Sequence, residues 1–567
     1  MLRTRLWTRS IVLAIVLIGI TATVSQHQRS IPNAHAATTL TVTTTADNAP
    51  PCSASAFSLR CAISRANKDG SGDTIVFNIP AASNNCFGTP PVCTTGLSKS
   101  LPVLTASHTT INGYTQPGAH LNSNSLSSGD NAVLTILIRN PTLTQGFDAL
   151  DITGSNNTIE GLDFTGFLIN LSTRAGGNAL FIELGSNNNL IAGNFFGVGT
   201  DGNSVGPNTN GVLVAGNSDL IGGTTPASAN VVSGSYWRDI ELDGNLNTVE
   251  GNLVGTNAAG TKAAGAGIGR GSDNILSTGS NNTIGGTTSG AGNVISGGTG
   301  AGVSIFEGDA NAILDNLIGT NAADTAAIPN ATGSKATDHG GVIIQGANAT
   351  VSGNVISSNR GGGVSVAYPG AVLTANFIGV TATGNGISIS SLYNPISTGT
   401  IGGTSPGAGN IVAYNTFSGV TVGPASITST HVTINGNSIF ANGGGGFGGL
   451  GIDLLPEGVV NCNTPPPGPN DYLPCPVITS ATTKQVGGTA CAGCLVEVFI
   501  ATNEADDQGH GEGKTFLGRV TAASTGKWSL SLLTGQVTAG QQVTATATTT
   551  STPLETSEFG ANVVVTS

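Results

Sequence analysis

The segment Gly193-Asn194-Phe195-Phe196-Gly197 decides the fold, because three related segments follow it at nearly constant intervals. They are Gly251–Gly255, Asp315–Gly319 and Ala375–Gly379, and the four asparagines stand 58, 64 and 60 residues apart. A second series has the same rhythm: Asn230–Ser233, Asn293–Ser296, Asn354–Ser357 and Asn410–Ala413. The centre of the chain is therefore a repeat of about sixty residues, which indicates a stacked repeat architecture.

Short runs of β-branched residues fill each period. Gly211–Val214 and Gly341–Ile344 alternate with period two and are bounded by Gly, Asn and Thr. Gly and Asn tolerate the left-handed conformation that sharp corners need. We therefore predict an all-β protein, a right-handed parallel β-helix, in which each period forms three coils of about twenty residues. Residues 147–455 would then hold roughly fifteen coils.

The N-terminus has the pattern of a secretory signal. Three arginines precede the apolar run Ile11–Ile20, and Ala34-His35-Ala36 supplies small residues for cleavage, so residues 1–36 are predicted to be removed. A membrane anchor is the alternative, but the apolar run is short for a bilayer span. We predict a secreted or cell-surface protein with no membrane span after signal cleavage.

Four further regions follow from composition. Residues 37–100 are predicted to be an N-terminal cap, in which Ser58 begins a short helix, Gly70 ends it and Asp73–Phe77 forms the first strand. Residues 101–455 are assigned to the β-helix. Residues 456–476 are rich in proline and are predicted to be a linker or cap. Residues 477–567 alternate as strands and predict a small immunoglobulin-like β-sandwich.

Eight cysteines lie in four close pairs outside the central repeat. An even count in an exported chain favours disulfides over zinc or redox chemistry. The predicted pairs are Cys52/Cys61, Cys86/Cys93, Cys462/Cys475 and Cys491/Cys494.

Several of these segments together resemble a known family. Ser58-Leu59-Arg60-Cys61-Ala62-Ile63, Asp73–Phe77 and Ile111–Ala119 are similar to exported bacterial right-handed β-helix repeat proteins of the CSLREA type. Gly509–Gly518 is similar to the Ig-like module that often closes them. The chain departs from the naming motif, with Cys61 where the family has Glu. The resemblance implies an extracellular or cell-surface protein, and the family has no agreed catalytic residues.

The charge balance excludes some partners. The chain has 19 Lys and Arg against 31 Asp and Glu, a formal net charge of −12. Nucleic acid and anionic membranes select clustered cations, so neither is an expected partner.

Two motifs resemble catalytic signatures but have a simpler interpretation. Gly403–Gly407 matches the nucleophile elbow, yet the same turn reads Thr224-Thr225-Pro226-Ala227 in another copy, so Ser405 is a corner residue. Gly446–Gly451 fits a dinucleotide-binding pattern inside a glycine run and is interpreted as a loop. We assign no catalytic residue and no cofactor, with calcium as the one open option.

Two groups of residues are candidate sites. Tyr236, Trp237, Arg238 and Asp239 combine aromatic rings with hydrogen-bonding groups, which suits a sugar ring if the aromatics point outward. Asp163 and Glu183 are twenty residues apart, as are Asp219 and Asp239. With coils of about twenty residues, either pair could face its partner across adjacent coils and bind calcium, although solvated charges on an outer face remain the alternative.

These observations predict a non-catalytic role in adhesion, carbohydrate binding or envelope structure. Extracellular glycans or matrix components are the expected partners, and the oligomeric state is left open. The alternative function is a polysaccharide lyase or glycoside hydrolase of pectinase-like type, by analogy of fold.

Overall fold

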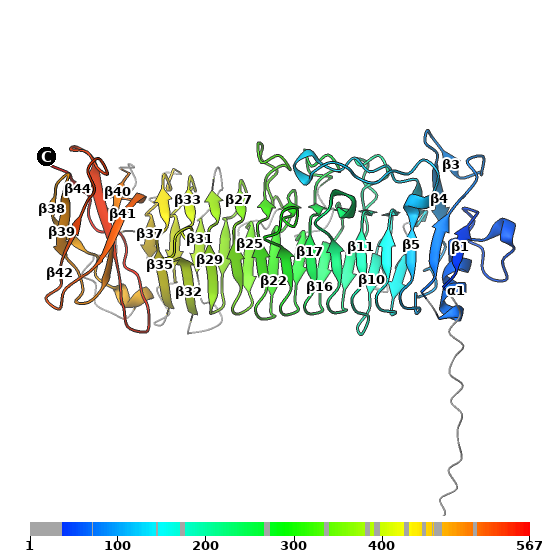
Figure 1. Cartoon of the computed structure of the whole chain (residues 1–567), viewed down its shortest axis with the longest axis horizontal. Coiled ribbons are helices and arrows are strands. Elements are labelled where there is room, and N and C mark those ends of the chain that lie inside the picture. Colours follow the sequence, from blue (N-terminus) through cyan, green and yellow to red (C-terminus); the bar gives the residue numbers. More distant parts are fainter. Residues whose placement is uncertain are drawn as a thin grey trace, which may run out of the picture.

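The protein is a long rod of stacked strands, with a helix at one end and a smaller β-module at the other (Figure 1). The structure is a computed structural model. It describes residues 37–70, 72–142, 146–170, 176–265, 273–333, 340–379, 386–389, 397–423, 430–444, 449–455, 458, 468–502 and 507–567.

Three sheets form the faces of the rod and are almost entirely parallel. Sheet A contains β1 (Thr39–Val42), β2 (Thr74–Phe77), β5 (Thr110–Asn112), β8 (Thr158–Glu160), β11 (Leu190–Ala192), β14 (Leu220–Gly222), β17 (Thr248–Glu250), β20 (Thr283–Gly285), β23 (Ala312–Leu314), β26 (Thr350–Ser352), β29 (Ala371–Thr374), β32 (Ser397–Gly402) and β35 (Thr430–Asn435). Sheet B contains β3 (Cys86–Phe87), β4 (Val92–Gly96), β6 (Ile136–Arg139), β9 (Asp163–Thr165), β12 (Phe195–Phe196), β15 (Val231–Val232), β18 (Leu253–Val254), β21 (Val294–Ile295), β24 (Leu317–Ile318), β27 (Val355–Ser357), β30 (Phe377–Gly379), β33 (Ile411–Ala413) and β36 (Ser438–Phe440). Sheet C contains β7 (Leu150–Ile152), β10 (Asn178–Ile182), β13 (Asn210–Val214), β16 (Arg238–Leu242), β19 (Ile275–Ser277), β22 (Val303–Phe306), β25 (Val342–Gln345), β28 (Val364–Val366), β31 (Ile387–Ile389), β34 (Val420–Val422) and β37 (Ile452–Leu454).

The chain visits the three sheets in turn, and each strand pairs with the equivalent strand of the next coil. This is the right-handed parallel β-helix that the sequence predicted. Inward Val, Ile and Leu side chains stack in columns and form one continuous core. Phe164 and Phe196 are part of that core and stack with 5.3 Å between their ring centroids.

The predicted coil length of about twenty residues is wrong. Ile191 pairs with Ile221, and Ile221 pairs with Val249, so one coil takes about thirty residues. A sixty-residue period therefore contains two coils and not three. The two asparagine series are alternate members of one ladder, because Asn194 Nδ2 donates to Asn230 Oδ1 at 3.3 Å and Asn230 Nδ2 donates to Asn252 Oδ1 at 2.9 Å.

This asparagine ladder fills the corner between sheets A and B. Each side-chain amide also donates to a backbone carbonyl, so buried polar atoms are paired along the rod. Its members are Asn194, Asn230, Asn252, Asn293, Asn316, Asn354, Asn376, Asn410 and Asn437.

The period of two coils arises because the corners from sheet A to sheet B differ in length. The corner Val249–Asn252 is short, whereas Ile221–Asn230, Ile284–Asn293 and Ile401–Asn410 are long and carry Gly-Gly-Thr. Long corners stand out from the rod as ridges, and short corners lie between them. The alternation is interrupted once, because the corner Val351–Asn354, where a long corner would be next, is short and lacks Gly-Gly-Thr.

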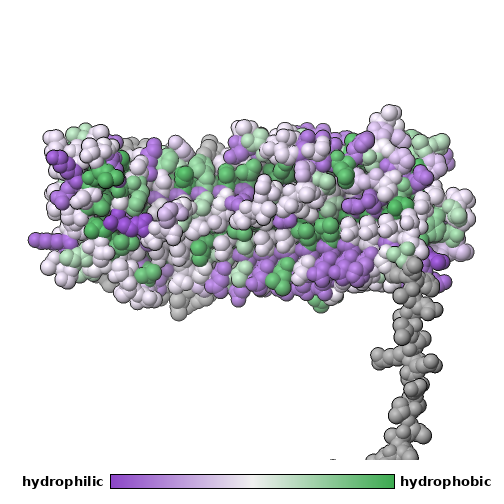
Figure 2. Space-filling model, in the orientation of Figure 1, coloured by the Kyte–Doolittle hydropathy of each residue, from purple (hydrophilic) through white to green (hydrophobic). Residues whose placement is uncertain are grey.

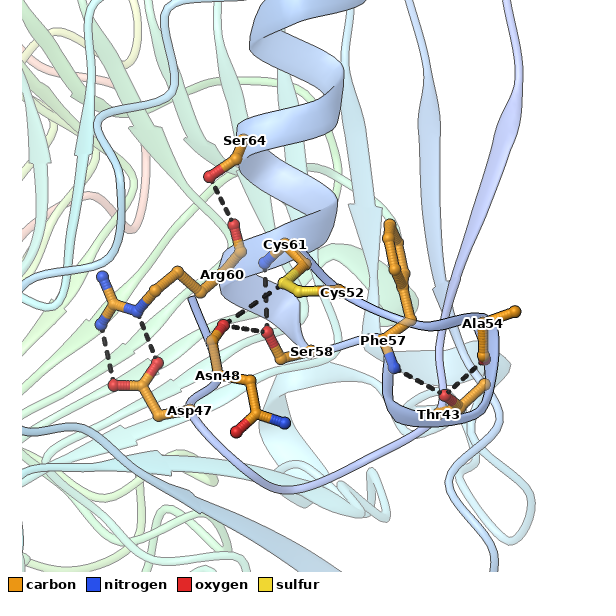
Figure 3. The surroundings of a disulfide bond; sticks show 10 residues. All are labelled: Thr43, Asp47, Asn48, Cys52, Ala54, Phe57, Ser58, Arg60, Cys61 and Ser64. Carbon is orange, nitrogen blue, oxygen red and sulfur yellow. Dashed lines mark hydrogen bonds and ion pairs between the residues drawn. A yellow bond between two sulfur atoms is a disulfide. The ribbon is translucent and has the colours of Figure 1, made fainter. Parts of the chain in front are cut away.

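The N-terminal cap contains helix α1 (Leu59–Asp69), as predicted. Ser58 Oγ accepts a hydrogen bond from Cys61 N at 3.1 Å, and Gly70 ends the helix in the left-handed conformation. Figure 3 shows the disulfide Cys52–Cys61 beside this start. Asp73–Phe77 is not the first strand, because β1 precedes it and pairs with it in parallel.

Buried charge also anchors this cap. Figure 3 shows the guanidinium of Arg60 paired with Asp47, with 2.7 Å between Nε and Oδ1. The same guanidinium donates to the carbonyls of Ser100 and Lys99. A second disulfide, Cys86–Cys93, joins β3 to β4.

The C-terminal module consists of two antiparallel sheets around a core of its own. One sheet contains β38 (Val477–Ala481), β39 (Gln485–Thr489) and β42 (Lys527–Ser531), and the other contains β41 (Gly513–Thr521), β40 (Leu495–Ala501), β43 (Gln542–Thr548) and β44 (Val563–Val564). The disulfide Cys491–Cys494 lies just before β40. The immunoglobulin-like assignment stays a prediction.

The fourth predicted cysteine pair is described at one end only. Cys475 lies just before β38, is buried with 7% of its surface exposed, and is disulfide-bonded. Cys462 lies outside the described residues, so the pairing of Cys475 with Cys462 stays a prediction. The bonded state of Cys475 agrees with the predicted disulfide chemistry, and its burial places it in the packed end of the rod and not in an exposed linker.

This module closes the open end of the rod. Buried glutamates from it accept hydrogen bonds from the last coil: Glu497 from Gly436 N at 2.7 Å and Glu558 from Leu454 N at 2.9 Å. Glu512 accepts from the side chain of Asn442. Unpaired strand edges invite aggregation, and these contacts occupy them.

The predicted linker contributes to the same closure. Asn470, in the 3-10 turn Pro469–Tyr472, donates to the carbonyl of Val432 and accepts from its N–H. Much of 456–476 and all of 1–36 lie outside the described residues. Within the described part of the chain, no helix is long and apolar enough to cross a membrane.

Candidate functional site

The structure divides the predicted cluster at residues 236–239. Trp237 is 42% exposed, whereas Asp239 is 6% exposed and accepts a hydrogen bond from Ser235 N at 3.1 Å. Arg238 lies between them, with its Nε 3.9 Å from Asp273 Oδ2. Trp237 therefore lies at the surface and Asp239 does not, and a binding role for the outer residues of this cluster stays a prediction.

Asp239 and Asp273 line a small recess of about 10 Å³. Such a volume holds about one water molecule and excludes a sugar ring. Burial raises the pKa of Asp239 to about 7, opposed by its hydrogen bonds from Ser235. A carboxyl in so small a space has a structural environment and not that of a substrate cleft.

The predicted calcium pairs are not brought together across adjacent coils, because a coil takes about thirty residues. Asp163 begins β9 of sheet B, whereas Glu183 follows β10 of sheet C. Asp219 precedes β14 of sheet A, and Asp239 lies in β16 of sheet C. Among the residues that the structure describes, no three His, Cys, Asp or Glu side chains group as metal ligands do.

A different acidic group gathers around Glu183. Asp151 lies in β7, opposite Phe181 of β10, close to Asp148 and Glu183. Burial, followed by the charges of Asp148 and Glu183, raises the pKa of Asp151 to about 7. A spacing of twenty residues does not predict this group, because Asp151 and Glu183 are separated by about one coil of thirty residues.

A long excursion of the chain borders a groove on the surface of the rod. Residues 113–134, which we name the strap, leave the third strand of sheet A and run along the rod over later coils (Figure 1, cyan segment). Tyr114 Oη donates to the carbonyl of Gly193 at 2.7 Å, and Asn122 Nδ2 donates to that of Pro226 at 2.9 Å. Farther along, Asp130 N donates to the carbonyl of Ala258.

A groove of about 540 Å³ lies between the strap and two ridges. The ridges are the long corners at Thr224–Ala229 and Gly286–Gly292, and the short corner at Gly251 lies between them. Asn122 and Ser125–Ser127 of the strap close the third side. The alternation of long and short corners therefore creates the hollow, and the strap makes it a groove. Its volume is typical of a small-molecule site.

The lining of the groove combines apolar residues with polar ones and is nearly neutral. Thr224, Thr287, Thr288 and Ser289 are exposed, and their hydroxyls have no hydrogen-bond partner in the described part of the chain. Asp315 is the one carboxylate among the lining residues, and none of them is Lys, Arg or His. The arrangement offers donors and acceptors to a ligand without a strong electric field.

The Gly-Gly-Thr corners gave no sequence prediction of a site, because they resemble a catalytic motif only at Ser405. Ser405 does lie on an exposed corner between β32 and β33, as predicted. The signal for the ridges was the number of residues between a sheet A strand and the next asparagine of the ladder, which is small at some corners and large at others. The strap has no comparable signal, because its course over later coils depends on tertiary contacts.

Comparisons with known proteins identify no family. No family model matches the chain, and no curated protein matches it. Among solved structures, the enzymatically active domain of bacteriophage CBA120 tailspike protein 2 aligns with a TM-score of 0.31 and 9% identity, over 86% of this chain and 70% of that chain. A PL6 family polysaccharide lyase from Pseudopedobacter saltans gives 0.35 and 12%, over 71% and 78%. Pectate lyase Pel9A gives 0.29 and 10%, over 72% and 80%.

Proposed function

We propose that the protein is an extracellular, non-catalytic glycan-binding protein and that the strap groove is its binding site. The observation that carries this proposal is the lining of the groove. Hydroxyls of Thr287, Thr288 and Ser289 face open space without partners in the described part of the chain, opposite Asn122 and Ser125–Ser127 of the strap. Hydroxyl and amide groups of this kind hydrogen-bond the hydroxyls of a neutral sugar.

The same lining disfavours hydrolysis within the groove. Glycosidases use two carboxyl groups on either side of the scissile bond, and Asp315 is a single carboxylate among the lining residues. A lyase needs a base to remove a proton and cations to stabilise the resulting charge, and the lining offers Asp315 but no Lys, Arg or His. Binding without turnover is the function that these residues support.

Titration calorimetry of the mature chain with neutral oligosaccharides tests the proposal. Thr288→Trp fills the groove and is expected to abolish binding. Ser405→Trp places the same ring on the third long corner, which no part of the strap covers, and is expected to leave binding unchanged. Equal affinities for wild type and Thr288→Trp would place the ligand elsewhere.

A second candidate function is a glycoside hydrolase acting through the sheet C acids. The pKa of Asp151, about 7, suits a general acid, and Glu183 is the nearby second carboxyl. Release of reducing ends from a polysaccharide, abolished by Asp151→Asn, would support this function. A wild-type chain that releases none from uronate and neutral polymers would remove it.

Export is part of the proposal. The leader pattern at residues 1–36 and the disulfides support an oxidising, extracellular destination. The membership in the CSLREA type, the Ig-like module and a role in adhesion are proposed on the same basis. N-terminal sequencing of the exported chain is expected to begin near Ala37; a retained leader would contradict it.

A further inference from the structure

Aromatic and cationic side chains meet where sheet B contacts the C-terminal module. Tyr414 and Phe440 pack edge to face with 5.5 Å between ring centroids, and Lys514 Nζ lies 4.6 Å from the Phe440 centroid. Ser438 Oγ donates to the carbonyl of Lys514 at 2.6 Å, so β41 runs beside β36. Two modules therefore build one surface.

The surface continues along β41. Arg519 Cζ lies 5.1 Å from the Phe516 centroid, and its guanidinium is held by the Thr404 carbonyl at 3.0 Å and by Glu497 at 3.5 Å. Figure 2 shows hydrophobic side chains gathered at this end of the molecule, over the strands that Figure 1 labels β40 and β41, with hydrophilic ones beside them. We name the surface the junction platform; its members are Tyr414, Phe440, Lys514, Phe516 and Arg519.

The platform is open to solvent. Tyr414 is 52% exposed and Phe516 is 39% exposed. Lys514 is exposed. Within the described part of the chain its ammonium group contacts the Phe440 ring and forms no salt bridge. Phe499 lies beneath Phe516 at 5.6 Å and is 2% exposed, so the outer rings rest on a packed base. Rings held in this way are preorganised for a flat ligand.

We propose that the junction platform binds an acidic polysaccharide. Aromatic faces stack on the apolar face of a pyranose ring, and Lys514 and Arg519 provide charge for its carboxylates. A net charge of −12 repels polyanions at long range, so an acidic chain needs such local cations. Two cations suit a polymer with separated charges, whereas nucleic acid selects a dense cationic tract. This site is independent of the strap groove.

Calorimetry of the mature chain with an oligogalacturonate tests the proposal. Lys514→Gln and Tyr414→Ala are each expected to weaken binding by about fivefold to tenfold. Lys514→Arg should retain the affinity, and Lys527→Gln, an exposed lysine on β42, should leave it unchanged. Affinity should fall as salt is raised, because the contact is partly ionic.

Several results would overturn the proposal: no binding at low salt, an equal loss in Lys527→Gln, or equally tight binding of a DNA oligonucleotide. Thr288→Trp separates the two sites, because it should abolish neutral-glycan binding and leave oligogalacturonate binding intact. The thermal unfolding temperature of each variant, unchanged within about 2 °C, shows that the loss is not a loss of fold.

Discussion

The outer face of sheet B is covered in the first half of the rod and open in the second. Phe195, Val231, Leu253 and Val294 occupy equivalent outward positions on successive strands and are at most 1% exposed. They pack beneath Leu126 of the strap and neighbouring loops. Ile411 occupies the same position near the other end and is 39% exposed. One repetitive scaffold thus carries two surfaces, because irregular segments cover only part of it.

The largest expected effect follows from this contrast. Leu253→Ala removes a fully buried side chain under the cover and is expected to lower the free energy of unfolding by about 2–4 kcal/mol. Ile411→Ala, at the equivalent open position, is expected to cost less than about 1 kcal/mol. Chemical denaturation of both variants measures the difference. Equal costs would show that the two halves are covered alike.

A smaller effect concerns the acids of the first half. Among the described carboxyl groups, those whose pKa is raised to about 6 or 7, mainly by burial, lie between residues 130 and 239. A raised pKa means that the folded state holds protons more tightly than the unfolded state does. These carboxyl groups therefore make their full contribution to the free energy of unfolding below about pH 4. That contribution is lost as the pH rises through 6 to 7. The unfolding temperature should fall between pH 4.5 and 8.

Asp219 allows a direct test of this pH dependence. It stands among hydrogen-bonded asparagines, accepts from Asn189 N at 2.7 Å, and its Oδ2 is buried without a partner in the described part of the chain. Asp219→Asn should raise the free energy of unfolding by about 1–2 kcal/mol at pH 8 and change it little at pH 4. The same gain at both pH values would contradict an electrostatic cause.

The smallest effect concerns the corners between sheets C and A. Leu246 and Asn281 hold the same position in adjacent coils and have φ of 60° and 57°. Leucine is strained in this left-handed conformation, whereas asparagine tolerates it. Leu246→Asn should stabilise the protein by about 0.5–1 kcal/mol, and Asn281→Leu should do the reverse. Thermal unfolding measures both; a stabilising Asn281→Leu would contradict the backbone explanation.

Local sequence patterns were enough to predict the fold class, the helix with its caps and three complete disulfide pairs. For the fourth predicted pair, the structure shows that Cys475 is disulfide-bonded but does not describe its partner. The predicted coil length was wrong, since Asn194 and Asn230 look like separate series until their side chains are seen to form one ladder. The closure by Glu497 and Glu512 was also missed. Such contacts join residues that are distant in the chain and have no local signal.

The candidate sites were less predictable than the fold. Trp237 is exposed, as a binding role requires, but strand geometry separates it from Asp239. The strap groove and the junction platform both depend on segments that cross from one part of the rod to another. Residues 113–134 and 513–521 each lie beside coils whose sequence gives no indication of them.

Hydrogen–deuterium exchange with a neutral oligosaccharide that binds the mature chain tests the central claim most directly. We expect slower exchange in the strap and in the corners at 224–229 and 286–292, with no change at the corner 404–408, which the strap does not reach. Protection confined to other segments, or spread evenly along the rod, would contradict the groove as the binding site.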